Sequence, residues 1–437
     1  MHSHRLLHET ALSLDFDQLL NILVNVENVL IIQDLDGVCM GLVKDPLQRS
    51  IHRGYVEAAA QFSPHFYVLT NGEHIGTRGV NRILEKAFGH DAYLRRQGCY
   101  LPGLAAGGVQ WQDRFGQVSH PGVSDQELAF LQSIPDRIRD RLQQFCDNYL
   151  QHLAPAVIND CIDASVLDNM ASPTANLNSF YEALREQPAV YAKLQAEMQA
   201  LMDACLQDAT AQGLDASFFV HYAPNLGRDA SGMEIMRPAT EIDSGTTDFQ
   251  FMLRGAVKEA GVPVILNHYY YQRTGTYPLG AEFNARQAPQ DYDELLDLIA
   301  TSFDSFAMPI IIGVGDTVNS QVVEQDKSQT VRRGGSDRNF LQLIQDIGQI
   351  FNKGNIIVYV DSSQGEVKNR RQVNLEKDPD GSLYVVQGPC DPKDTSDPLQ
   401  LNIVFPGGHQ QYTEVFQYAS ETRQQRQRTL RRQPSQY

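Results

Sequence analysis

Short apolar runs alternate with amphipathic segments along much of the chain. Five of the runs are rich in Val and Ile and end near polar residues or glycine: residues 29–32, 66–69, 263–266, 309–314 and 356–360. Buried parallel strands have this composition. Helical periodicity precedes two of the runs, at residues 292–303 and 340–351. The alternation predicts an α/β fold whose core is a doubly wound, mainly parallel sheet.

The middle of the chain has a different pattern. Helical segments predominate there and two strand-like segments follow them, at residues 125–132, 136–150, 179–186, 189–212, 217–222 and 233–236. We interpret residues 103–240 as an inserted α/β cap domain. Residues 1–102 and 241–437 then form one core that the insertion splits.

The C-terminal part predicts less regular structure. Residues 383–387 and 401–405 are apolar enough to form a final pair of strands. A segment rich in Gln and Arg follows Glu421, and we expect residues 422–437 to be a flexible, solvated tail. A partner-binding arm is the alternative for this segment.

Composition and charge limit the partners of the protein. Apolar residues make up 42% and charged residues 20% of the 437 positions, so the chain can bury a core. The 36 basic and 53 acidic side chains give a formal net charge of −17, which repels nucleic acids. The apolar runs are too short to span a bilayer, and the six cysteines form no CxxC pair. We therefore expect a cytoplasmic protein without a membrane or nucleic-acid partner.

The clearest chemical signal follows the first apolar run, where the chain continues as Asp34-Leu-Asp36-Gly37. Ligands of α/β proteins bind at the carboxyl ends of the strands. Two carboxylates at this spacing can divide two tasks. One can attack phosphorus, and the other can protonate the leaving oxygen and then deprotonate the attacking water. A surface turn or part of a calcium-binding loop is the alternative for so short a motif.

An Asp-x-Asp-Gly sequence behind a buried strand resembles the first motif of the haloacid-dehalogenase-like (HAD) phosphohydrolases. The resemblance implies that Asp34 is the nucleophile and that Asp36 is the general acid and base. The second motif of these enzymes is an apolar strand that ends in Thr or Ser. Residues 66–72 match it with Thr70 and Asn71, although Thr-Asn-Gly is also a common turn. A hydroxyl and backbone N–H groups at this point can hold a phosphate oxygen.

The fourth motif of the superfamily is an apolar strand that ends in an acidic loop. Residues 308–316 match this motif and end in Asp316. The usual second acidic residue falls at Ser320, so the sequence departs from the pattern, but residues 335–341 resemble the end of the motif displaced by an insertion. The resemblance thus implies an Mg²⁺ site formed by Asp34, the Asp36 backbone carbonyl, Asp316 and Asp337. Capping of a helix N-terminus is the alternative role of Asp337.

The third motif contributes a basic residue that neutralises the nucleophile and the phosphate, and two residues are candidates. Lys258 follows residues 233–238, which resemble the cap exit of sugar phosphatases, but it lies late in its predicted helix. Arg286 precedes the helix that leads to the fourth motif, which is the expected position. Either residue can also be an ordinary surface charge.

The inserted segment resembles the caps of trehalose-, sucrose- and mannosylglycerate-phosphate phosphatases. Such a cap excludes water and recognises the leaving group. The polar residues that can contact sugar hydroxyls here are His221, Tyr222, Asn225 and Arg228. An ordinary turn accounts for these four residues equally well.

Longer stretches of sequence narrow the resemblance: residues 34–46, 67–74, 315–320 and 333–338. Together with the chain length they resemble the glucosylglycerol-3-phosphate phosphatases, the salt-tolerance phosphatases of photosynthetic bacteria. The resemblance covers about residues 25–420. It implies hydrolysis of 2-O-glucosylglycerol 3-phosphate to the osmolyte glucosylglycerol, beside the synthase that makes the substrate. The alternatives are a phosphatase for another sugar or glycoside phosphate and a non-catalytic scaffold that binds a phosphosugar.

Overall fold

The first apolar run becomes β1 (Val29–Gln33), the strand around which the core is built. The computed structural model describes residues 6–229, 232–240, 243–325, 328–367 and 370–432. In it β1 pairs in parallel with β12 (Ile310–Gly315) on one side and β2 (Phe66–Leu69) on the other. Because side chains alternate along a strand, Val29 and Ile31 pack on one face of the sheet and Leu30 and Ile32 on the other. A strand covered on both faces needs such an uninterrupted apolar run.

The core sheet has eight strands in the order β18-β15-β12-β1-β2-β3-β4-β5. The strands not yet bounded are β15 (Ile356–Val360), β18 (Ile403–Phe405), β3 (Gly103–Ala105), β4 (Gln110–Gln112) and β5 (Val118–Ser119). Pairing is parallel from β18 to β3 and antiparallel from β3 to β5. The predicted doubly wound α/β core is confirmed, and four of the five predicted apolar strands lie in it.

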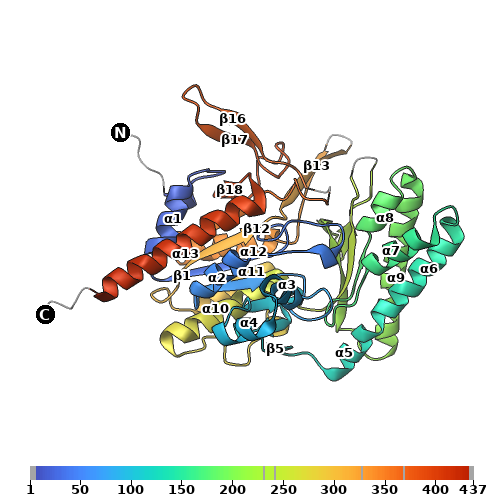
Figure 1. Ribbon diagram of the computed structural model, residues 1–437, viewed down its shortest axis with the longest axis horizontal. Helices are drawn as coiled ribbons and strands as arrows, with labels where there is room; N and C mark the ends of the chain where they lie inside the picture. The colour runs from blue at the N-terminus through green and yellow to red at the C-terminus, as the bar shows by residue number, and fades with distance from the viewer. Residues whose placement is uncertain (1–5, 230–231, 241–242, 326–327, 368–369, 433–437) are drawn as a thin grey trace.

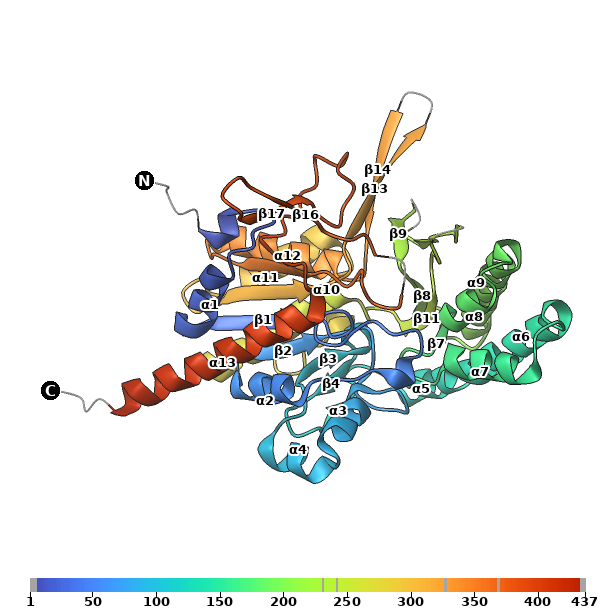
Figure 2. The ribbon, with the colours of Figure 1, turned by 45° about the horizontal axis from the view of Figure 1, so that its top comes forward.

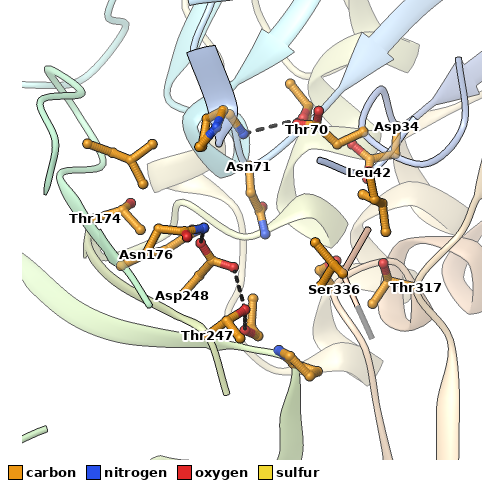
Figure 3. Close-up of a pocket in the computed structure, with 18 of the residues that line it drawn as sticks. Asp34, Leu42, Thr70, Asn71, Thr174, Asn176, Thr247, Asp248, Thr317 and Ser336 are labelled. Carbon is orange, nitrogen blue, oxygen red and sulfur yellow. Dashed lines mark hydrogen bonds between the residues drawn. The ribbon is translucent and has the colours of Figure 1, made fainter. Parts of the chain in front are cut away.

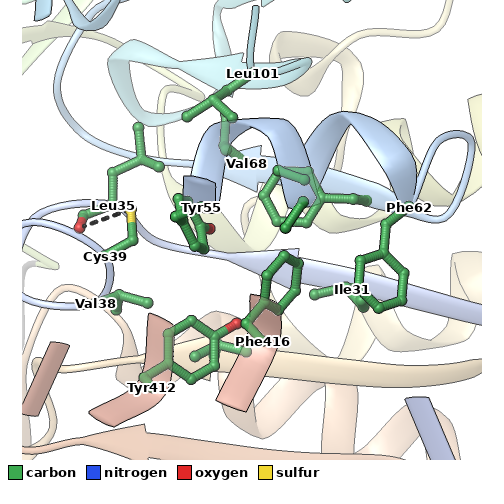
Figure 4. Close-up of a cluster of buried hydrophobic side chains, with 14 of the residues drawn as sticks. Ile31, Leu35, Val38, Cys39, Tyr55, Phe62, Val68, Leu101, Tyr412 and Phe416 are labelled. Carbon is green, nitrogen blue, oxygen red and sulfur yellow. Dashed lines mark hydrogen bonds between the residues drawn. The ribbon is translucent and has the colours of Figure 1, made fainter. Parts of the chain in front are cut away.

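Helices cover both faces of this sheet (Figure 1). One face carries α1 (Phe16–Asn25), α2 (Arg53–Gln61), α3 (Val80–Phe88), α4 (Asp91–Gln97) and α13 (Gly408–Arg432). The other carries α10 (Lys258–Thr274), α11 (Tyr292–Ser302) and α12 (Arg338–Ile350). Figure 4 shows Tyr412 and Phe416 of α13 in one buried cluster with Tyr55 of α2, Phe62 at the end of that helix and Ile31 of β1. The C-terminal helix is therefore part of the core.

The fifth predicted strand is wrong, because residues 263–266 lie inside α10. All four residues are buried between the sheet and α12, and Pro263 is accommodated within the helix. A helix that is buried on most sides needs apolar residues in succession, as a buried strand does. A run of four residues therefore cannot distinguish the two by periodicity.

The C-terminal predictions also need correction. Residues 422–432 continue α13 and are not a flexible tail, while residues 433–437 lie outside the described ranges. The buried guanidinium of Arg423 donates hydrogen bonds to the Leu23 and Val26 carbonyls, at 2.7 and 2.8 Å, and so joins α13 to the end of α1. The predicted final strand pair does not form. β17 (Leu383–Gln387) pairs with β16 (Asn374–Lys377), whereas β18 joins β15 in the core sheet.

The inserted cap has one helical layer and one antiparallel sheet in the order β6-β7-β11-β8 (Figure 1). Its helices are α5 (Asp125–Gln132), α6 (Ile134–Tyr149), α7 (Pro155–Ser165), α8 (Asn178–Ala183) and α9 (Pro188–Ala211). Its strands are β6 (Val166–Leu167), β7 (Thr174–Asn176), β8 (Phe218–Ala223) and β11 (Asp248–Leu253), with β9 (Asn225–Arg228) and β10 (Glu234–Met236) as a separate pair. The insertion thus runs from α5 to β11 and not over residues 103–240, because β3 to β5 complete the core sheet.

A two-stranded hairpin separates Asp316 from Asp337. It consists of β13 (Asn319–Gln325) and β14 (Ser328–Gly334), and Figure 2 shows it projecting beside β9 of the cap. This hairpin is the insertion that displaces the end of the fourth motif. Throughout the described ranges, no helix combines the length and the apolar character needed to cross a membrane.

Candidate active site

Three carboxylates meet where the central strands end. Asp34 follows β1, Asp316 follows β12, and Asp337 lies at the N-terminus of α12. Each offers an oxygen within 4.8 Å of the oxygens of the other two, and all three residues are buried. In the sheet β2 lies on one side of β1 and β12 on the other, so the strand order reverses at β1. An α/β sheet binds ligands at such a topological switch point. The structure therefore brings together two acidic motifs that are far apart in sequence.

Asp337 reaches this cluster although the hairpin displaces it along the chain. Its side chain makes no capping hydrogen bond to α12. Instead its Oδ2 atom accepts hydrogen bonds from the backbone N–H groups of Asp316 and Thr317, both at 2.9 Å. Asp337 thus holds the loop that carries Asp316. It does not cap the N-terminus of α12 through its side chain, which was the alternative role.

Lys258 is the basic residue that the structure places in the cluster. Its Nζ atom lies 2.9 Å from Asp34 Oδ2 and 2.6 Å from Asp337 Oδ1. It is the first residue of α10, and not a late residue as the sequence pattern predicted. Burial disfavours the ammonium charge, but Asp337 and Asp34 outweigh it and keep the pKa of Lys258 above its usual value. The lysine therefore stays protonated between the two carboxylates.

Arg286, the other candidate, lies outside the pocket. Its Nη2 atom is 2.7 Å from Glu127 Oε1 of α5, and its Nη1 and Nε groups donate to the Gly122 and Arg254 carbonyls. Gly122 and Arg254 belong to the two connections between core and cap. Arg286 therefore ties these connections to the core and has no contact with the carboxylate cluster, which removes it as a phosphate ligand.

The cluster has the electrostatics of a cation site. Burial raises the pKa of Asp34 to about 8, with the charges of Asp337 and Asp316 adding to the rise and Lys258 opposing it. Burial likewise raises the pKa of Asp316 to about 6, against the opposing charge of Arg370. Asp34 Oδ1 is buried without a hydrogen-bond partner among the described residues. An all-oxygen donor set with an unsatisfied carboxylate oxygen fits Mg²⁺.

Two arginines that the sequence analysis missed complete the charged part of the site. Arg49 Nη1 lies 2.9 Å from Asp36 Oδ2. Arg370 Nε lies 3.5 Å from Asp316 Oδ2, and its Nη2 atom donates to Thr317 Oγ1 at 3.0 Å. Both arginines come from loops without a recognisable motif, so no local signal in the sequence identifies them.

The second motif forms the wall between core and cap. Thr70 and Asn71 both line the pocket (Figure 3), and the Thr70 hydroxyl accepts a hydrogen bond from the Gly72 backbone N–H at 3.3 Å. Asn71 Nδ2 lies 3.2 Å from His221 Nε2 of the cap. The loop after β2 therefore supplies a hydroxyl beside Asp34 and also contacts the cap.

Polar side chains of β7 and β11 face the carboxylate cluster across the pocket. Asn176 and Asp248 are register partners, and Asn176 donates to the Asp248 carboxylate at 2.7 Å. Thr247 donates to the other oxygen of Asp248 at 3.1 Å (Figure 3). The alternate residues Phe249 and Phe251 point into the apolar core of the cap. The sequence analysis missed these strands, although the period-two alternation from Asp248 to Phe251 is their signal.

The four cap residues predicted from sequence fall in different places. His221 and Asn225 line a neighbouring pocket, with His221 Nδ1 2.9 Å from Glu234 Oε1 and Asn225 donating to Glu234 Oε2. Arg228 lines the same pocket, 3.7 Å from Glu234 Oε1. Tyr222 needs correction as a sugar contact. It follows His221 on β8, so it points to the opposite face, where its ring packs against Phe249 in the cap core.

The pocket between core and cap is open to solvent. Its core side carries the carboxylates, Lys258 and two arginines, and its cap side carries uncharged hydrogen-bonding groups and Asp248. The division of charge suits a ligand with one anionic end and one end rich in hydroxyl groups.

Comparison with known proteins gives matches across both domains. Residues 28–420 match the family described as glucosylglycerol-phosphate phosphatase. A glucosylglycerol-phosphate phosphatase of Synechocystis sp. is 56% identical over 417 residues, which are 95% of this chain and 98% of that protein. The C-terminal domain of C. albicans trehalose-6-phosphate phosphatase has a TM-score of 0.45 at 10% identity, covering 94% of this chain and 99% of that one. A trehalose-6-phosphate phosphatase related protein has a TM-score of 0.39 at 9% identity, covering 91% and 99%.

Proposed function

The chain belongs to the glucosylglycerol-phosphate phosphatase family and is a phosphatase, and we propose that its substrate is 2-O-glucosylglycerol 3-phosphate. We further propose that the reaction depends on Mg²⁺ and passes through an aspartyl-phosphate. The observation that carries this proposal is the position of Asp34. Its Oδ1 atom, which has no hydrogen-bond partner among the residues described, lies in a buried carboxylate cluster with Lys258, opposite the polar side of the cap.

The proposed reaction uses Asp34 and Asp36 in turn. The Asp34 carboxylate attacks phosphorus, the bond between phosphorus and the glycerol oxygen breaks, and Asp36 gives that oxygen a proton. Asp36 then takes a proton from water, which attacks the aspartyl-phosphate and releases inorganic phosphate. Asp36 suits this part because its side chain is one-third exposed, which leaves it accessible to substrate and water.

The charged residues around Asp34 prepare the site for a phosphate. Lys258 neutralises charge on Asp34 and holds its carboxylate in place, and the Thr70 hydroxyl lies where it can donate to a phosphate oxygen. Asp34, Asp316 and the Asp36 carbonyl would hold Mg²⁺, with Asp337 supporting the Asp316 loop. When bound, the metal supplies positive charge that offsets the charge of the phosphate.

The cap supports a glycoside as the leaving group. Asn176, Asp248 and Thr247 present donors and acceptors on the cap side of the pocket, across from Thr70 and Asp34 (Figure 3). A sugar ring offers several hydroxyl groups that can satisfy such an array. We expect this enzyme to act after the synthase that makes glucosylglycerol phosphate, and its product to serve as a compatible solute.

A substrate panel tests the proposed specificity. We expect rapid phosphate release from glucosylglycerol 3-phosphate in the presence of Mg²⁺, and release at least about 100-fold slower, by kcat/KM, from trehalose 6-phosphate and sucrose 6-phosphate. A site built around particular hydroxyl groups leaves its polar groups unpaired with the wrong sugar, which costs factors of this size. Faster release from another sugar phosphate would agree with the proposed mechanism but would show that the substrate is different. Folded protein that releases phosphate from none of them would contradict the proposal.

Binding of Mg²⁺ should depend on pH in a defined direction. Protons compete with the metal for Asp34 and Asp316, whose pKa values are raised to about 8 and about 6. Apparent Mg²⁺ affinity should therefore rise from pH 6 to pH 8, by up to about tenfold per pH unit. Thermal unfolding in a series of Mg²⁺ concentrations at each pH measures this affinity. Asp316→Asn should weaken the metal-dependent stabilisation, whereas the exposed Asp140→Asn control should leave it unchanged; equal stabilisation in all three proteins would contradict the assignment.

A further inference from the structure

Glu73 lies three residues after Thr70 on the same loop, yet its carboxylate is bound mainly by the cap. It is 2% exposed. Its Oε1 atom accepts hydrogen bonds from the Ala171 and Ser172 backbone N–H groups at 2.6 and 2.8 Å and from the Ser172 hydroxyl at 3.1 Å. Its Oε2 atom accepts from the Met170 N–H at 3.0 Å and from Gln110 Nε2 at 3.1 Å. Four of these five hydrogen bonds come from one short cap segment.

Burial raises the pKa of Glu73, but the hydrogen-bond donors around its carboxylate favour the ionised form. Both oxygens face donors, three of which are backbone N–H groups that cannot reverse their role. Gln110 cannot turn its amide to offer an oxygen without a loss, because its own Oε1 atom accepts from the His74 backbone N–H at 2.6 Å. A neutral amide at position 73 would therefore place an NH₂ group against buried donors. Charge-assisted bonds of this kind are stronger than neutral ones.

The two ends of this contact belong to the two halves of the pocket. On the core side, Glu73 shares a loop with Thr70 and Asn71, which line the phosphate end. On the cap side, residues 170–172 lead directly into β7, whose Thr174 and Asn176 line the opposite wall. Asn176 in turn holds Asp248 of β11. Glu73 is therefore only a few residues from the core wall of the pocket, and the cap segment that it binds is only a few residues from the cap wall.

We propose that Glu73 is a positioning residue that fixes the distance between the phosphate-binding loop and cap strand β7, and thereby selects substrates that fill both halves of the pocket. The proposal rests on the proposed function, because it assumes a substrate with a phosphate at one end and a sugar at the other. A substrate that reaches only the core half does not depend on the position of β7. Glu73 should therefore matter for the glycoside phosphate and not for a small phosphate ester.

Steady-state kinetics of Glu73→Gln on two substrates tests this selectivity. We expect KM for glucosylglycerol 3-phosphate to rise at least about tenfold, since the cap contacts act in binding the glycoside. For p-nitrophenyl phosphate, kcat/KM should stay within about threefold of the wild type, because the core half is unchanged. Glu186→Gln, an exposed carboxylate of the same cap, is the matched control and should behave as the wild type on both substrates.

Hydrogen exchange of the amides of residues 170–172 gives a second readout that needs no substrate. These amides should be protected in the wild type and should exchange at least about tenfold faster in Glu73→Gln. An equal loss of activity on both substrates would overturn the proposal, since Glu73 would then only support the Thr70 loop. Unchanged kinetics, or unchanged exchange, in Glu73→Gln would overturn it as well. A wild type that hydrolyses p-nitrophenyl phosphate but no glycoside phosphate would refute the proposed substrate, and the exchange data would still decide whether Glu73 fixes the cap segment.

Discussion

Asp34→Asn is expected to lower phosphate release from glucosylglycerol 3-phosphate by about 10⁴-fold or more, as loss of a catalytic nucleophile does. The amide has nearly the shape of the carboxylate but carries no charge and is a poor nucleophile. Lys258 keeps its second partner, Asp337, at 2.6 Å. The variant should therefore fold, and the loss should appear in kcat because the reacting atom itself has changed.

The stability of the same variant gives an independent check. The pKa of Asp34 is raised to about 8 in the folded state from an ordinary value of 3.8, so the folded protein binds the proton more tightly than the unfolded chain. Without a metal, ionisation of Asp34 thus costs stability progressively as the pH rises from about 4 to about 8. Asp34→Asn removes this cost, so at pH 8 its unfolding temperature in metal-free buffer should not be below that of the wild type.

The exposed cap substitution Asp140→Asn is the matched control, and it should change neither activity nor unfolding temperature. Normal phosphate release by folded Asp34→Asn, in a preparation shown by mass spectrometry to be free of deamidation, would refute the proposed nucleophile. A variant that loses activity and also unfolds at a much lower temperature would show that Asp34 is needed for the fold, contrary to the argument from its pKa.

Lys258→Met should lower both stability and activity. The lysine is 3% exposed and is the cation between Asp34 and Asp337, so its removal leaves two buried carboxylates without their partner. Breaking a buried ion pair from one side costs about 3–5 kcal/mol of unfolding free energy. Activity should fall at least about 100-fold, because the phosphate and nucleophile lose a preorganised positive charge. Denaturant titration and phosphate release by the folded fraction measure the two effects.

The cost of Lys258→Met should also depend on pH. Without the lysine the pKa of Asp34 rises further, so the variant loses stability relative to the wild type as the pH increases and Asp34 ionises. Below about pH 4, where carboxyl groups are mostly protonated, the difference should be smallest. Lys86→Met replaces an exposed lysine of α3 and controls for the loss of a charge. A fully active Lys258→Met protein would limit Lys258 to a structural role.

The local sequence was sufficient to predict the core strands, including those that precede the acidic motifs. Residues 29–32, 66–69, 309–314 and 356–360 are strands of the core sheet, because a strand buried on both faces must be apolar throughout. The strand ends then place Asp34, Thr70 and Asp316 at one edge, since the carboxyl ends of neighbouring parallel strands lie together. The same reasoning failed for residues 263–266, where burial inside a helix produces the same composition.

Local sequence patterns predicted the cap less completely than the core sheet. The helices α5, α6, α8 and α9 were predicted to within about three residues at each end, but α7, β7 and β11 were missed and the cap boundary was placed before β11. Those strands are short, and their pairing joins segments that are about 70 residues apart in the chain, such as Asn176 and Asp248. Period-two alternation fixes which side chains share a face, but it does not say which strand lies alongside.

The sequence by itself determined the fold class and the insertion of a cap, because these follow from composition and periodicity along neighbouring residues, and its resemblance to the HAD phosphohydrolases indicated the acidic motifs. Only the tertiary structure decided between Lys258 and Arg286, brought Asp337 back to Asp316 across a hairpin, and added Arg49 and Arg370 to the site. It also showed that the Glu73 carboxylate accepts hydrogen bonds from the cap. The physical reason is that each of these contacts joins residues that no local pattern relates, so packing alone sets the distances on which their charges act.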